Sequence, residues 1–68
     1  MKIRFSEHID ESHRVGILEE LRQTFGALVE QTGDDYHISG IKPNRRTYLI
    51  DFLRREELRG TAVLDESD

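Results

Sequence analysis

The sequence has no cysteine and no tryptophan, and it holds one proline among 68 residues. Without cysteine, disulfides, thiolate metal sites and a cysteine nucleophile are excluded, so packing alone must stabilise the fold. Long apolar runs are also missing. The longest, such as residues 27–29, have three residues, whereas a membrane-spanning helix needs about 20. We therefore expect a soluble chain that has no membrane partner and resides in the reducing cytoplasm.

Charged residues are abundant instead. They make up 35% of the chain and leave a net charge of −4, whereas about a quarter of the residues are charged in a typical domain. A chain this short buries only about 60% of the surface that it exposes when unfolded, so its core must be thin. We expect one small domain over residues 1–64 and a charged C-terminal tail over residues 65–68. A partner or a second copy could supply further burial.

A strand and a helix are predicted in the first third of the chain. Residues 1–5 alternate apolar and basic side chains, the period-2 pattern of a half-buried strand. Residues 12–25 have the period of an amphipathic helix, which Asp10 or Ser12 is expected to cap and which Gly26 is placed to end. The apolar face of this helix is formed by Val15, Ile17, Leu18, Leu21 and Phe25.

A hairpin and a second helix follow. The β-prone segments 27–32 and 35–39 are separated by Gly33 and Asp34, which suit a tight turn between antiparallel strands.

The second helix is predicted over residues 45–58, because Pro43 interrupts the chain and Asn44 is a favourable N-cap. Gly60 follows its end, and residues 61–64 suit a last short strand. The face expected to enter the core comprises Tyr48, Leu49, Phe52 and Leu53.

This order of elements predicts an α+β fold of the ferredoxin-like type, βαββαβ. Right-handed crossovers place a four-stranded antiparallel sheet beneath two helices that share one face. If the last segment is not a strand, a three-stranded βαββα layout remains as the alternative. The fold hosts many unrelated functions, so function must be argued from individual residues.

No residue pattern associated with catalysis or cofactor binding is present. The chain has no glycine-rich phosphate loop, no HExxH pair and no Ser-His-Asp arrangement. His8, His13 and His37 do not share a helix face, since the first two lie about 140° apart around a helix. We therefore expect solvated or structural histidines, no metal or other cofactor, and a protein that is not an enzyme.

The least expected feature is a basic segment in an acidic chain. Residues 42–59 contain six basic and three acidic side chains, a net +3, so the rest carries −7 within the total of −4. A local excess of arginine favours an anionic or acidic partner. The residues predicted to bind that partner are Lys42, Asn44, Arg45, Arg46, Arg54 and Arg55.

The start of the second helix allows two interpretations. Arg45 and Arg46 add cations where backbone N–H groups already carry partial positive charge, and a bound phosphate or carboxylate would remove that conflict. Alternatively, their stems cover apolar surface along the helix flanks, while Asp51 and Arg55 form an ordinary i,i+4 ion pair.

The sheet face without helices is a second candidate. There Lys2, Arg4, His37 and Ser39 are expected to project together. RNA-binding modules use the equivalent face but place stacking aromatics on it, whereas the aromatics of this chain are better used in the core. Such a face is expected to meet another subunit.

These observations predict a small protein-interaction or regulatory module that forms a homo-oligomer. It would meet its copy through the sheet face or an edge strand, or meet an acidic partner through the arginine-rich helix. The alternative is a nucleic-acid or phosphate binder that uses the same helix. The net charge of −4 favours the protein partner, because nucleic-acid-binding domains are usually strongly basic.

Overall fold

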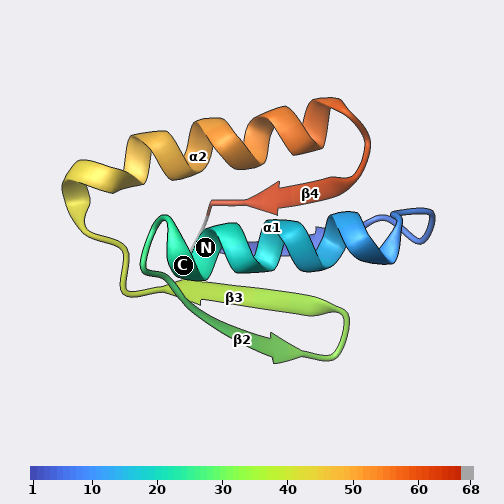
Figure 1. The fold of residues 1–68 in the computed structure, drawn as a ribbon, viewed down its shortest axis with the longest axis horizontal. Coiled ribbons are helices and arrows are strands. Elements are labelled where there is room, and N and C mark those ends of the chain that lie inside the picture. Colours follow the sequence, from blue (N-terminus) through green and yellow to red (C-terminus); the bar gives the residue numbers. More distant parts are fainter. Residues whose placement is uncertain (67–68) are drawn as a thin grey trace.

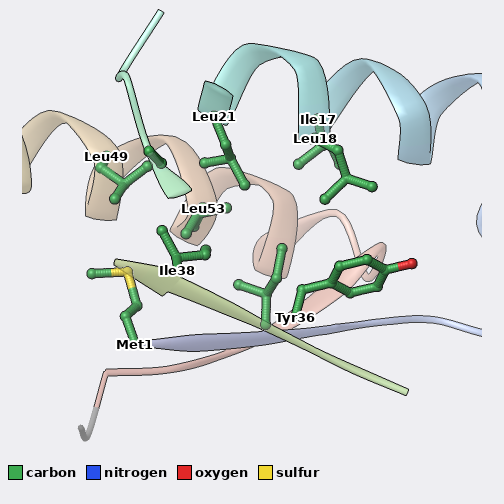
Figure 2. Close-up of a cluster of buried hydrophobic side chains, with 10 residues drawn as sticks. Met1, Ile17, Leu18, Leu21, Tyr36, Ile38, Leu49 and Leu53 are labelled. Atoms are coloured by element: carbon green, nitrogen blue, oxygen red, sulfur yellow. The ribbon is translucent and has the colours of Figure 1, made fainter. Parts of the chain in front are cut away.

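The computed structural model describes residues 1–66, which form a sheet and two helices that cover one of its faces (Figures 1 and 2). The four strands pair antiparallel in the order β2-β3-β1-β4. This is the predicted ferredoxin-like arrangement. In chain order the elements are β1 (Lys2–Phe5), α1 (Glu11–Gln23), β2 (Leu28–Thr32), β3 (Asp35–Ser39), α2 (Pro43–Leu58) and β4 (Ala62–Asp65).

The last strand is present, so the three-stranded alternative is wrong. β4 pairs with β1 over four positions, which end with Lys2 opposite Asp65. It therefore extends one residue beyond the strand predicted at 61–64, into the segment predicted as a tail at 65–68. Residues 67–68 of that segment lie outside the described part of the chain.

Alternation along the strands decides which side chains enter the core. Tyr36 and Ile38 of β3 are buried under the helices, whereas His37 between them is exposed on the other face. Figure 2 shows Met1, Tyr36 and Ile38 on the sheet side of the core, with the leucines of both helices opposite them. The largest fully buried side chains are Ile3, Leu21, Leu49 and Leu53.

Each helix ends shortly before a glycine with positive φ, as predicted. Gly26 has a φ of 65° after α1, and Gly60 has a φ of 78° after α2. At the first of these ends, the Ala27 N–H turns back and donates to the Leu21 carbonyl at 2.9 Å. Glycine suits both positions because it adopts this conformation without the steric cost of a Cβ atom.

The start of α2 differs from the prediction. Pro43 is the first helical residue and Lys42 occupies the N-cap position, so Asn44 lies inside the first turn and does not cap. Proline suits this place because its fixed φ matches the helix and its missing N–H needs no partner there.

Two residues predicted in the core lie outside it. Val15 is 40% exposed and Tyr48 is 67% exposed. Each lies roughly 110° around its helix from the centre of the buried face, at the border of that face, where the sheet and the other helix do not cover it. The other aromatics are used as predicted: Phe5 contacts Tyr36 with ring centroids 5.2 Å apart, and a similar contact at 5.8 Å joins Phe25 and Phe52.

Candidate interaction surfaces

The residues predicted to bind an anionic partner do not form one cluster, because they are spread around α2. Successive helical residues point about 100° apart, so Arg45 and Arg46 lie on different flanks. Lys42 and Arg45 line a hollow of about 240 Å³ together with residues 23–26 at the end of α1. Arg54 instead forms an ion pair with Glu66.

The end of α1 explains why cations are tolerated at the start of α2. The carbonyl end of a helix carries partial negative charge and stabilises nearby cations. Lys42 and Arg45 lie beside that end, next to Thr24 and Gly26. These cations oppose the dipole of their own helix but complement that of its neighbour. A bound anion is therefore not needed to account for them.

The side of α2 that faces away from the core carries a line of exposed residues, which we call the outer stripe. Tyr48 and Leu58 in this line are 67% and 89% exposed. Asp51 and Arg55 do not form the ion pair of the alternative interpretation, and neither has any ion-pair partner within residues 1–66. The outer stripe consists of Asn44, Tyr48, Asp51, Arg55 and Leu58.

The helix-free face of the sheet is polar, and its basic side chains Lys2 and Arg4 are paired with carboxylates within the chain. Arg4 Nε donates to Asp35 Oδ1 at 2.9 Å, and Lys2 Nζ lies 3.9 Å from Asp65 Oδ2. The hydrogen bond from Arg4 lowers the pKa of Asp35 below its ordinary value. The register confirms that this face carries the side chains predicted there, Lys2, Arg4, His37 and Ser39.

Apolar residues on the helix-free face are separated from one another. Leu28 and Val63 are 69% and 64% exposed. They lie on β2 and β4, the two edge strands, with β1 and β3 between them. The charged side chains of the two central strands therefore divide the apolar surface on this face.

A buried polar cluster that the sequence did not indicate joins both helices to the start of β4. Glu56 is 5% exposed, and its Oε2 lies 2.7 Å from His13 Nε2 and accepts from the Thr61 hydroxyl at 2.8 Å. Arg59 donates to the other carboxylate oxygen at 3.3 Å. Burial raises the pKa of Glu56, but the hydrogen bonds from Thr61 and His13 and the charges of His13 and Arg59 outweigh it, leaving this pKa below its ordinary value.

The role of this cluster is to hold elements together. Its sequence signal is weak: Glu56 falls one turn after Phe52 on the apolar face of α2, and His13 falls one turn before Ile17 of α1. The described residues contain no buried side-chain polar atom without a partner, and both oxygens of the Glu56 carboxylate are bonded within the cluster. The adjacent hollow of about 280 Å³ adds no hydroxyl or thiol nucleophile.

A further hollow, of about 560 Å³, lies at the end of the sheet beside Arg4, Arg14 and Tyr36. Both of its arginines are already engaged: Arg14 donates to the Tyr36 hydroxyl at 2.9 Å and also bonds Glu11, while Arg4 bonds Asp35. Among residues 1–66, no three histidine, aspartate or glutamate side chains gather as the ligands of a metal ion would. These arrangements support binding surfaces better than a reaction centre.

Neither helix in the described part of the chain is long and apolar enough to cross a membrane. Comparison of the chain with protein-family models, with curated proteins and with solved structures found no match. Inference about function therefore rests on the surfaces of the molecule itself.

Proposed function

We propose that the chain is a small, non-catalytic protein-interaction module that associates with a second copy of itself. The observation that carries this proposal is the exposure of Tyr48 and Leu58, at 67% and 89%, on one side of α2. A chain of 68 residues has little core of its own. Tyr48 and Leu58 are available to contact a partner, and aromatic side chains are enriched at protein interfaces.

The outer stripe supports an interface better than the helix-free sheet face does. On the sheet, Arg4 pairs with Asp35 and Lys2 with Asp65, so a partner would have to compete with existing ion pairs. On the outer stripe, Asp51 and Arg55 have no ion-pair partner among the described residues. A partner of complementary charge would gain these contacts without breaking others.

A phosphate or nucleic-acid ligand is less well supported. Of the six predicted residues, Lys42 and Arg45 lie beside the end of α1, and Arg54 is paired with Glu66. The others lie on the opposite flank of α2 or on the outer stripe, so the six do not form a continuous basic surface. The net charge of −4 also opposes binding to a polyanion. We propose that the module acts by protein association in the cytoplasm, a location favoured by its cysteine-free composition.

Light scattering across roughly 5 to 500 micromolar protein tests the proposal. We expect the molar mass to rise from that of one 8.0 kDa chain towards twice that value. A mass that stays at one chain over the whole range contradicts self-association. Repeating the measurement with a short RNA at two salt concentrations tests the alternative, because a nucleic-acid complex weakens steeply with salt.

A further inference from the structure

We propose that two copies of the chain pair through their α2 helices, packed antiparallel with the outer stripe of one against the outer stripe of the other. This inference deepens the proposed self-association and rests on it. It adds the relative direction and the register of the two α2 helices, which the general proposal does not specify.

The spacing of the outer stripe suits two helices that pack along their length. Its residues follow one another at alternating intervals of four and three positions, the pattern that keeps a line of side chains on the seam between two helices. The stripe lies opposite the buried Leu49 and Leu53. Figure 1 shows α2 along the outer border of the molecule, where a second helix can approach it.

Charge selects the antiparallel direction. In a parallel pair related by a two-fold axis, Asp51 would face the partner's Asp51 and Arg55 the partner's Arg55, so both contacts would repel. In an antiparallel pair, Asp51 can face the partner's Arg55 instead. The two-fold axis then generates a second, equivalent ion pair between Arg55 and the partner's Asp51.

One antiparallel register also brings the exposed apolar residues together. Asp51 with Arg55, and Tyr48 with Leu58, have the same midpoint at position 53 of α2. The register that pairs the two charges therefore places Tyr48 beside the partner's Leu58, and Leu58 beside the partner's Tyr48. Moving the midpoint to 51 or 55 would set two aspartates or two arginines against each other.

The resulting interface has the composition of a binding hot spot. Two ion pairs lie at its centre, and a tyrosine and leucine contact lies on each side of them. Apolar contacts on both sides exclude water from the charges, which strengthens their attraction. Exposed Tyr48 and Leu58 thus lie on the same helix face as Asp51 and Arg55, which have no ion-pair partner among the described residues.

A charge exchange tests the register. In a dimer of the Asp51→Arg variant, each of the two charge contacts would join two cations. In a dimer of the Arg55→Asp variant, each would join two anions. We expect each variant alone to be monomeric at about 100 micromolar, with a dissociation constant raised at least tenfold. Mixed in equal amounts, the two variants regain opposite charges at every contact and should form a heterodimer of twice the monomer mass.

Glu19→Arg on the exposed side of α1 is the matched control, since it makes the same charge change away from the outer stripe. It should remain dimeric, and circular dichroism should show native helix content in all variants. If the wild type dimerises and both single variants still do so, this register is wrong while self-association stands. Variants that are monomeric alone and stay monomeric when mixed also overturn it. A wild type that is monomeric throughout overturns the proposed self-association itself.

Discussion

The inner and outer faces of α2 both carry charged residues, but only the inner face provides them with partners. Glu56 on the inner face is buried and bonded to His13, Thr61 and Arg59. Asp51 on the outer face is exposed and has no ion-pair partner among the described residues. The difference shows that a carboxylate on a helix is explained by what the fold places opposite it. Asp51, which the fold leaves in solvent, is accessible to a partner molecule.

Replacing one leucine on each face of α2 by alanine should give the largest difference in stability. Leu53→Ala removes a side chain that is 1% exposed and should lower the free energy of unfolding by about 2 to 5 kcal/mol. Leu58→Ala, at 89% exposure, should change it by less than about 0.5 kcal/mol when measured at low micromolar concentration. Urea melts followed by circular dichroism compare the two. Equal losses would contradict the assignment of the faces.

Replacing a carboxylate should also lower the free energy of unfolding more on the inner face of α2 than on its outer face, but the difference should be smaller than for the leucines. Glu56→Ala leaves His13 and Thr61 without their partner and should cost about 1 to 3 kcal/mol. Asp51→Ala is the control and should lie within about 0.5 kcal/mol of the wild type. A Glu56 variant as stable as the Asp51 variant in the same urea melts would show that the buried cluster does not stabilise the fold.

The stabilisation by Glu56 should depend on pH. Its pKa is lower in the folded than in the unfolded chain, so the contribution is complete above the unfolded pKa of about 4.3 and is lost as the pH falls through the folded pKa. The difference in stability between wild type and Glu56→Gln should therefore shrink between about pH 6 and pH 3. Melts at several pH values measure it. A difference that stays constant would argue against an ionised carboxylate in the cluster.

The smallest expected effect is a difference in stability between variants of two neighbouring arginines, Arg45 and Arg46. Arg45→Gln removes a cation beside the end of α1 and should lower stability by about 0.3 to 1 kcal/mol at low salt. Arg46→Gln, on the other flank, should leave stability unchanged or raise it slightly, because its charge opposes the dipole of α2. Thermal melts in low and high salt compare them. If an added phosphate stabilises the wild type and neither variant, the anion-binding interpretation would replace this one.

The elements of the fold could be predicted from the sequence because each has a local cause. The alternation of residues 1–5, the apolar faces around Leu21 and Leu53, and the glycines at positions 26 and 60 specify where strands and helices form and end. Their order then leaves few ways to build a sheet. The N-cap of α2 was predicted wrongly at Asn44, because two local preferences competed and the proline at position 43 determined the first turn.

The sequence by itself therefore determined the strand and helix pattern, the fold and most of the core. Only the tertiary structure decided that Glu56 lies against His13, that Arg45 lies beside the end of α1, and that Tyr48 stays in water. The physical reason is range. Periodicity and turn preferences act between residues close in sequence, whereas the partner of a charge and the margin of a thin core depend on which distant elements pack together.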